Sequence, residues 1–191
     1  MPEFEADPDA ELMLRLRDGE DLMLNQLMTR WQRPLAAFIY RYIGHQADAL
    51  DLAQETFVRV YETRHRYTPS AKFSSWLFTI AANLCRNHLR WRQRRGHAAL
   101  ESLDGEIVAS IISWDDSPAD ATMRSESISI VKNAIGKLPH DLRTAVLLHE
   151  YEDLSYEEIS TVLRCSVKAV EMKLYRARKL LRESLSRSSL R

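Results

Sequence analysis

Apolar residues recur at helical spacing along most of this chain, and no long stretch alternates between apolar and polar residues as a half-buried strand does. Leu24, Leu27, Met28 and Trp31, for example, follow the i, i+3, i+4, i+7 pattern of one helix face. The 191 residues include only five glycines and six prolines, too few for the many tight turns of a sandwich or barrel. The sequence therefore predicts an all-α protein.

Breaks in this periodicity divide the chain into two small helical domains. We expect the first domain over residues 1–95 and the second over residues 125–191. Residues 96–124 between them have no sustained period and are rich in acids, which is typical of a flexible linker.

Helix breakers set the expected boundaries inside the first domain. Pro34 lacks the N–H that a helix interior needs, so we expect it to break one helix, and we expect Gly44 to end the next. After a loop around Pro69, a long helix should run from about Ser74 to Arg95.

The formal net charge is zero, but the charges are sorted into blocks. Six bases and no acid lie between residues 72 and 97, and seven bases and one acid lie between residues 164 and 182. Two basic blocks, each inside an amphipathic helix, favour two surfaces for a polyanion over two ordinary solvated faces. The charge pattern therefore favours binding to nucleic acid.

The end of the chain has the pattern of a helix-turn-helix. Ser155 and Glu158 have the spacing of a capping box before a short helix that ends near Leu163, and Ser166 can cap a last helix three residues later. That last helix has an apolar face and a polar face, and the polar face suits a DNA major groove. The candidate DNA-binding residues are Ser166, Lys168, Glu171, Met172, Lys173, Tyr175, Arg176 and Lys179. The alternative is a plain surface helix of a bundle.

The long basic helix carries a second candidate surface. A polar stripe follows one face of this helix, and a loop rich in aromatic and small polar residues precedes it. Asparagine can read a base edge, arginine can hold phosphate, and an aromatic ring can stack on an extruded base. The candidate residues are Tyr67, Lys72, Phe73, Trp76, Asn83, Asn87, Arg90 and Arg94. For Phe73 and Trp76, a place in the core is the favoured alternative.

The helix over residues 48–62 has an outward face that combines acids with apolar side chains. This combination is typical of a docking surface for a basic, partly apolar helix of another protein. The candidate docking residues are Asp48, Leu50, Asp51, Gln54, Glu55 and Val58. Asp48, Asp51 and Glu55 could instead hold a metal in a helical enzyme, but no second acidic motif faces them. We therefore expect no metal, no cofactor and no enzymatic activity.

Two parts of the sequence resemble a known family. DALDLAQETFVRVYE (48–62) followed by FSSWLFTIAANLCRNHLRWRQRR (73–95) resembles region 2 of bacterial RNA polymerase sigma factors. LPHDLRTAVLLHEYEDLSYEEISTVLRCSVKAVEMKLYRARKLL (138–181) resembles their region 4. A chain with only these two regions and a short linker is similar to the extracytoplasmic-function (ECF) branch of the sigma-70 family.

This resemblance implies a role for each candidate surface. The docking residues would bind the β′ coiled coil of core RNA polymerase, and the β flap would be a further contact. The loop and basic helix of the first domain would open and read the minus-ten promoter element as single strand. The helix from Ser166 would read the minus-thirty-five element as duplex. The implied function is that of an alternative sigma factor for promoter-specific transcription initiation in a stress or envelope response, with an anti-sigma factor as partner.

The chain departs from the family's pattern at positions that face DNA. The family usually has Gly where Arg164 stands, a Gly-Thr pair where Lys168 and Ala169 stand, and Asp where Asn87 stands. Glu171 adds an acid that can accept a hydrogen bond from a cytosine amino group. These departures bear on which promoter is read and leave the general role unchanged.

The residues alone leave a rival function open: a stand-alone helix-turn-helix regulator with a helical sensing domain. Such a protein would bind duplex operators by itself, as a dimer on palindromic sites, and would have no use for the docking residues.

Features that direct a chain to a membrane or an oxidising compartment are missing from the sequence. Cys85 and Cys165 are far apart and form no metal-binding or disulfide pattern, so we expect structural thiols. The chain has no signal-peptide pattern and no apolar run close to the ~18 residues that span a bilayer. We expect a cytoplasmic protein without membrane insertion.

Overall fold

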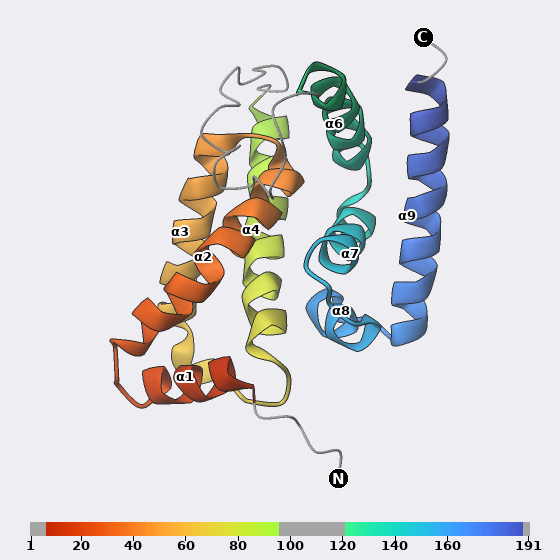
Figure 1. Ribbon diagram of the computed structural model, residues 1–191. Helices are drawn as coiled ribbons and strands as arrows, with labels where there is room; N and C mark the ends of the chain where they lie inside the picture. Colours follow the sequence, from red (N-terminus) through yellow and green to blue (C-terminus); the bar gives the residue numbers. More distant parts are fainter. Residues whose placement is uncertain (1–6, 96–120, 189–191) are drawn as a thin grey trace.

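The computed structural model describes residues 7–95 and 121–188. Most of these residues are helical and none lies in a strand, which confirms the all-α prediction (Figure 1). The elements are α1 (Pro8–Arg17), α2 (Met23–Ile43), α3 (Gln46–Glu62), the 3-10 turn η1 (Arg64–Arg66), α4 (Phe73–Arg94), α6 (Ala121–Gly136), α7 (His140–Glu150), α8 (Tyr156–Leu163) and α9 (Val167–Ser188). Within the described ranges, no helix is both long enough and apolar enough to span a bilayer.

Helices α1 to α4 form one bundle with an aromatic centre. Phe38 of α2 and Phe78 of α4 are fully buried, and their rings meet edge to face with centroids 5.1 Å apart. Leu77 and Ala81 of α4 are also fully buried, one and two turns along the helix from Phe73. The apolar stripe of α4 therefore faces the bundle, and its basic stripe stays outside.

The prediction that Pro34 breaks a helix is wrong, because α2 runs through it. Leu27 before the proline and Leu35 and Phe38 after it are all fully buried. Burying three such side chains contributes more than the ~3 kcal/mol that an interior proline costs a helix. Gly44 ends α2 as predicted: its φ is 77°, and its N–H donates to the Tyr40 carbonyl oxygen at 2.8 Å.

Helices α6 to α9 form the second bundle. The predicted capping box starts α8: Ser155 Oγ accepts from the Glu158 N–H at 3.2 Å, and Glu158 Oε2 accepts from the Ser155 N–H at 2.7 Å. Helix α6 begins at Ala121, inside the range that the sequence assigns to the linker. The remainder of the predicted linker, residues 96–120, lies outside the described residues.

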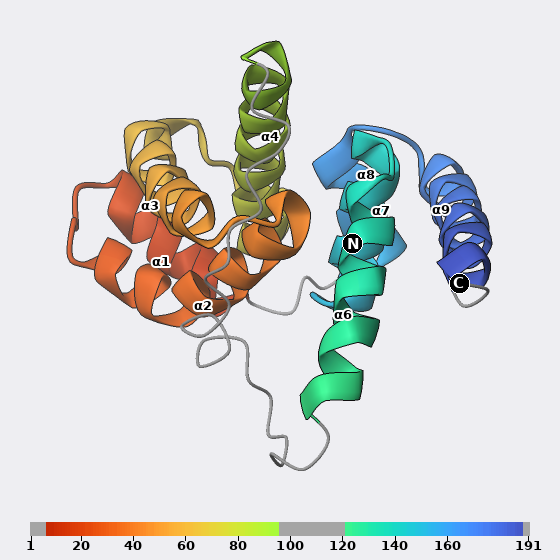
Figure 2. The ribbon, with the colours of Figure 1, turned by 90° about the horizontal axis from the view of Figure 1, so that it is seen from above.

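The two bundles lie against each other. Helix α4 contacts α8, and α2 contacts α6 and α7. Seen from above, α4 stands beside the second bundle, while α9 lies at the far edge of the molecule (Figure 2). The polar pairs that cross this boundary include Lys72 with Glu158 at 3.0 Å, Lys132 with Tyr40 at 3.1 Å and Arg41 with Glu152 at 3.3 Å.

Candidate nucleic-acid interfaces and docking face

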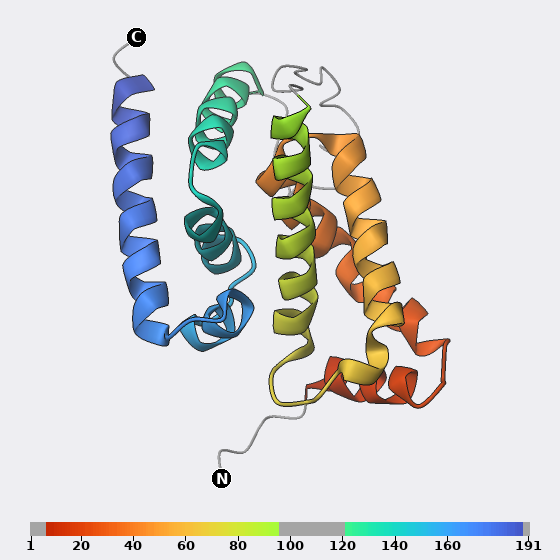
Figure 3. The same ribbon diagram turned by 180° about the vertical axis from the view of Figure 1, so that it is seen from behind.

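Helix α9 presents a continuous polar face away from the rest of the molecule. The view from behind shows α9 on the outer side of α7 and α8 (Figure 3). Its inner residues Val170, Leu174 and Ala177 are fully buried. Seven of the eight predicted DNA-binding residues of this helix are exposed: Ser166, Lys168, Glu171, Met172, Tyr175, Arg176 and Lys179. The exposed aromatic, basic and acidic groups of this face can contact both phosphates and base edges.

Lys173 is the eighth predicted residue of that set, and it points elsewhere. Its Nζ lies 2.6 Å from Asp141 Oδ2 on α7, and only 24% of its side chain is exposed. This ion pair holds the pKa of the Asp141 carboxyl below its usual value. Lys173 therefore joins α9 to α7 in this structure and is not part of the exposed face.

A left-handed residue makes the turn that precedes α9. Arg164 has φ 50° and ψ 51° and caps the carboxyl end of α8. The N–H of Cys165 then donates to the Ser160 carbonyl oxygen at 3.0 Å, and Ser166 Oγ accepts from the Ala169 N–H at 3.2 Å. The turn forms without glycine, although its backbone conformation favours glycine.

Near its carboxyl end, α4 carries an open hollow lined by polar and basic side chains. Asn87, Arg90, Gln93 and Arg94 line it, and all four are exposed. Three of them belong to the predicted stripe; Gln93 was missed because it falls one position before Arg94 and off the stripe's spacing. An amide beside several guanidinium groups can read a base edge while the phosphates on either side are neutralised.

Asn83 belongs to the same predicted stripe, but it faces the second bundle. Its Oδ1 accepts from Arg86 Nη2 at 2.8 Å. Both residues line a cavity between the bundles together with His140, Val162 and Arg164. The structure therefore splits the stripe, with Asn87, Arg90 and Arg94 open to solvent and Asn83 facing α8.

The aromatic residues before and at the start of α4 are packed against each other. Tyr67 is 2% exposed and Phe73 is fully buried, and both rings contact Trp76, with centroids 5.3 and 6.2 Å away. In this conformation Tyr67 and Phe73 are packed in the core beside the loop, which for Phe73 is the alternative that the sequence favours. Burial raises the pKa of the Tyr67 phenol to about 12. Lys72 remains exposed.

The outward face of α3 keeps most of its predicted docking residues accessible. Val58 is 54% exposed and Leu50 is 39% exposed, with Asp51 and Gln54 exposed between them. Glu55 is partly exposed and pairs with Arg59 of the same helix at 3.4 Å. The result is an acidic face with two apolar side chains, as a basic amphipathic helix requires of its partner.

Asp48, the remaining residue of this set, has its carboxylate turned toward α4. Asp48 Oδ2 lies 3.0 Å from His88 Nε2 and 3.7 Å from Arg92 Nη1. The pairs form where α3 and α4 pack against each other. In the described ranges, no three acidic, histidine or cysteine side chains converge as metal ligands, Asp48, Asp51 and Glu55 included.

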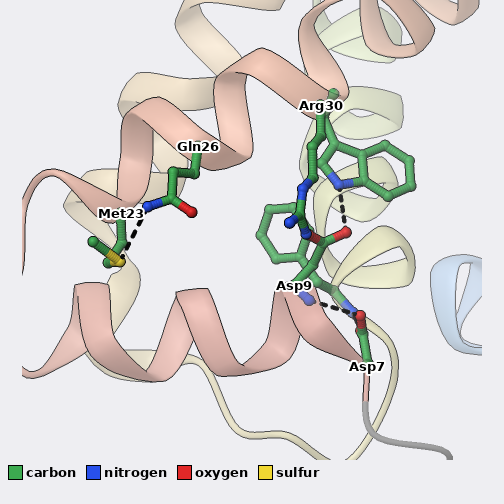
Figure 4. Close-up of polar contacts among 7 residues, drawn as sticks. Asp7, Asp9, Met23, Gln26 and Arg30 are labelled. Carbon is green, nitrogen blue, oxygen red and sulfur yellow. Dashed lines mark hydrogen bonds and ion pairs between the residues drawn. The ribbon is translucent and has the colours of Figure 1, made fainter.

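Two polar clusters were missed by sequence reasoning. Asp7 and Asp9, at the start of α1, contact α2 and α4 (Figure 4). The signal for this helix was present: Asp7 before Pro8 is a cap followed by a proline at the first helical position. The second cluster is Arg143 with its carbonyl partners, which joins residues about a hundred positions apart and has no local signal.

Comparison with known proteins identifies both halves. The Sigma-70 region 2 family model matches residues 27–95, and the Sigma-70 region 4 model matches residues 128–181. The chain is 34% identical to RNA polymerase sigma-H factor of Pseudomonas aeruginosa over 180 residues, which cover 93% of each protein. It is 31% identical to the ECF RNA polymerase sigma-E factor of Haemophilus influenzae over 180 residues, which cover 93% of this chain and 95% of that protein.

A solved structure shares the fold. The sigma factor RpoE of Bartonella quintana, in complex with the anti-sigma factor NepR, matches with a TM-score of 0.65 at 22% identity. The match covers 85% of this chain and 96% of that one.

Proposed function

Because the chain belongs to the extracytoplasmic-function branch of the sigma-70 family, we propose that its surfaces divide promoter recognition between the two bundles. The protein is an alternative sigma factor and not a stand-alone regulator. As a sigma factor it acts by binding polymerase and promoter DNA, and we assign no chemical step to its own side chains. We place its action in the cytoplasm, where its polymerase would be, and assign it to a stress or envelope response on the family resemblance alone.

The second bundle would read the minus-thirty-five element as duplex. The proposal is supported by the exposure of Lys168, Glu171 and Arg176 on one face of α9, where Glu171 and Arg176 follow Lys168 by three and eight residues. Arg176 and Lys168 would contact phosphates, and Glu171, near the amino end of the helix, would reach a base edge. This placement follows the usual docking of a recognition helix.

The first bundle would capture the minus-ten element as single strand. The hollow lined by Asn87, Arg90, Gln93 and Arg94 supports this role, because it combines base-reading amides with a positive field. The loop from Thr68 to Lys72, which is exposed except for the half-buried Ala71, would contact the strand beside it. Taking a base out of a duplex costs a few kcal/mol, which binding of the freed base would offset.

The outward face of α3 would dock on the β′ coiled coil of core polymerase. Leu50 and Val58 would be buried in that contact, and Asp51 and Gln54 would pair with basic or polar groups of the coiled coil. The β flap would contact the second bundle. Promoter recognition by the two bundles and docking by α3 use different surfaces, so one chain can do both at once.

An anti-sigma factor is the further partner that we propose. RpoE of Bartonella quintana, which shares this fold, is held by an anti-sigma factor in its solved complex. In this chain α8 lies over Asn83, beside the proposed minus-ten surface. A partner that holds the two bundles together would keep part of that surface covered.

The observation that carries the whole proposal is the presence of two basic surfaces, one on α4 of the first bundle and one on α9 of the second, together with an acidic docking face on α3. The test is transcription in vitro from fragmented genomic DNA of the source organism by core RNA polymerase, with and without this protein, followed by mapping of RNA 5′ ends. We expect discrete start sites that need the protein and share two upstream motifs. The absence of such starts, with no binding to core enzyme, would overturn the proposal. A Val58→Glu variant serves as a control, because it should lose core binding and start sites together.

A further inference from the structure

One carboxylate caps two helices that lie far apart in the sequence. Asp7 Oδ1 accepts from the Asp9 N–H at 3.0 Å and so caps α1, as Figure 4 shows. Asp7 Oδ2 accepts from the N–H of Phe73, the first residue of α4, at 2.8 Å. The residue at the N-cap of α4 is Lys72, whose side chain makes no capping hydrogen bond. Asp7 therefore supplies the cap that the sequence around α4 does not provide.

A second acid fixes α1 in place for this contact. The side chain of Asp9 is only 12% exposed, and it accepts from Arg30 Nη1 at 2.5 Å and from Trp31 Nε1 at 2.9 Å, both on α2. The Trp31 ring in turn meets the Phe73 ring edge to face, with centroids 6.2 Å apart. The start of α4 is thus held twice, through the Phe73 backbone by Asp7 and through the Phe73 ring by Trp31 of α2.

The held residue is also the end of the loop that we assign to the minus-ten strand. Phe73 closes the segment that contains the exposed residues Thr68, Pro69, Ser70 and Lys72. Its buried ring packs on Tyr67 at the other end of the segment, with centroids 6.4 Å apart. Phe73 therefore forms one end of the loop, and its ring contacts the residue at the other end, so the position of Phe73 contributes to the position of the loop.

We propose that Asp7 is a positioning residue for promoter opening, which it supports by holding the loop before α4 in its strand-binding arrangement. The inference rests on the minus-ten role proposed above for this loop. Asp7 itself does not touch DNA in this proposal. A loop that is already ordered does not have to be ordered when the bases arrive, so less binding free energy is lost at that step.

The test compares Asp7→Ala with Asp7→Asn and with Glu11→Ala. Asp7→Ala removes both acceptors; Asp7→Asn keeps one carbonyl oxygen and with it one of the two bonds. Glu11→Ala removes an exposed charge from the same helix and is the matched control. Hydrogen exchange of the free protein is the first readout: we expect the Phe73 amide to exchange about fivefold faster or more in Asp7→Ala, and amides of α9 to be unchanged.

Promoter opening is the second readout, on a promoter recovered from the transcription experiment. With core polymerase, Asp7→Ala should lower opening of the duplex about fivefold, as loss of the α4 cap predicts. Opening by Asp7→Asn should fall between that of Asp7→Ala and that of wild type. Core binding and affinity for the minus-thirty-five duplex should stay unchanged, which a general loss of structure would not allow. A template already mismatched over the minus-ten element should reduce the defect.

The possible outcomes distinguish failure of the Asp7 positioning role from failure of the proposed sigma-factor function. If the wild-type protein opens no promoter, the proposed function fails, and exchange at Phe73 still decides whether Asp7 orders the loop. If wild type opens promoters and Asp7→Ala does so equally well, or if Phe73 exchange is unchanged, the positioning role is overturned. If Asp7→Ala does not fold, Asp7→Asn carries both readouts, because it is nearly isosteric and keeps one cap.

Discussion

The guanidinium of Arg143, in the second bundle, donates from Nη1 to the backbone carbonyl oxygen of Tyr42, in the first, at 2.9 Å. Arg143 is 8% exposed, and its Nη2 donates to the carbonyl oxygens of Leu138, at 3.1 Å, and Gly136. Burying a charge is costly unless the group is hydrogen-bonded, and these bonds offset part of that cost for the guanidinium. Arg143 has three carbonyl acceptors only while the bundles are together, so this one side chain links the fold of the second bundle to closure against the first.

We predict that Arg143→Met lowers the free energy of unfolding by about 2–3 kcal/mol, because three carbonyl groups lose a charged donor. Urea unfolding followed by circular dichroism measures this. Arg178→Met is the matched control, since Arg178 forms an exposed pair with Glu150 at 2.8 Å; its loss should cost only about 0–1 kcal/mol. Equal losses in the two variants would contradict the special role of Arg143.

Acid should weaken the structure through His140, which lies at the same boundary and contacts the Tyr42 hydroxyl. Burial, with nearby Arg86, lowers the pKa of His140 from 6.5 to about 4. The folded state thus binds this proton less tightly than the unfolded state. The contribution of neutral His140 is complete above pH 6.5 and is lost as the pH falls toward 4. His140→Gln should therefore lose less stability between pH 7 and pH 5 than wild type, in urea unfolding at each pH.

Glu152 lies at the same boundary, and its effect on stability should change with pH in the opposite direction. Burial raises its pKa from 4.5 to about 7, although Arg41 opposes the shift. The folded state therefore binds this proton more tightly, and the stability difference between wild type and Glu152→Gln should move in favour of wild type as the pH falls from about 7 to 4.5. If His140→Gln and Glu152→Gln changed the pH profile in the same direction, the assignment would be wrong.

Arg164→Gly should stabilise the protein by about 1 kcal/mol, because the left-handed conformation of residue 164 strains every residue with a Cβ. Arg164 has φ 50°. Thermal unfolding measures the change. Arg182→Gly, at an exposed position inside α9, is the control and should destabilise by about 1 kcal/mol. A loss of stability in Arg164→Gly would show that its side chain contributes more than the strain costs.

The features that sequence reasoning found are those with a local cause. The capping box of Ser155 and Glu158 and the buried stripe of α9 depend on residues within a few positions of each other, so spacing reveals them. The prediction for Pro34 was wrong because the free-energy cost of a proline inside α2 is offset by buried side chains that pack against other helices. The bonds from Asp7 to Phe73 and from Arg143 to Tyr42 join distant segments. Only the packed structure brings those partners together.

The same distinction applies to the candidate surfaces. Periodicity placed Arg176 and Lys179 on an exposed face of α9, because a single helix decides which way they point. Asp48, Lys173 and Asn83 were also placed on exposed faces, but each meets a neighbouring helix or bundle. A helical wheel shows the direction of a side chain and cannot show what is packed there.

Arg176→Ala should weaken binding to the minus-thirty-five duplex and lower its salt dependence by about one unit of the log–log slope, because one phosphate contact is lost. Arg176 is exposed in the middle of the polar face of α9. Fluorescence anisotropy over a series of salt concentrations measures both quantities. Arg187→Ala, in the last turn of the same helix, is the control. An unchanged slope in Arg176→Ala would count against a phosphate contact there.

Asn87→Ala should weaken promoter opening more than it weakens formation of the closed complex. Asn87 lies exposed in the hollow on α4, and a base-edge contact of an amide is worth about 1–3 kcal/mol. Opening is measured by permanganate reactivity of thymines in the minus-ten element, and the closed complex by gel shift at low temperature. Asn83→Ala should have the smaller effect, because Asn83 bonds Arg86 and faces α8.

The control for this prediction is Asn133→Ala, which removes an exposed amide of α6 away from the hollow. If opening by Asn87→Ala equals that of Asn133→Ala, the hollow does not read the strand. If Asn83→Ala has the larger defect, α8 must leave the Asn83 surface before opening, and the strand must then extend from the hollow toward Asn83. The comparison of Asn87→Ala with Asn83→Ala therefore distinguishes a surface that is exposed while the bundles are packed together from one that is exposed only after they move apart.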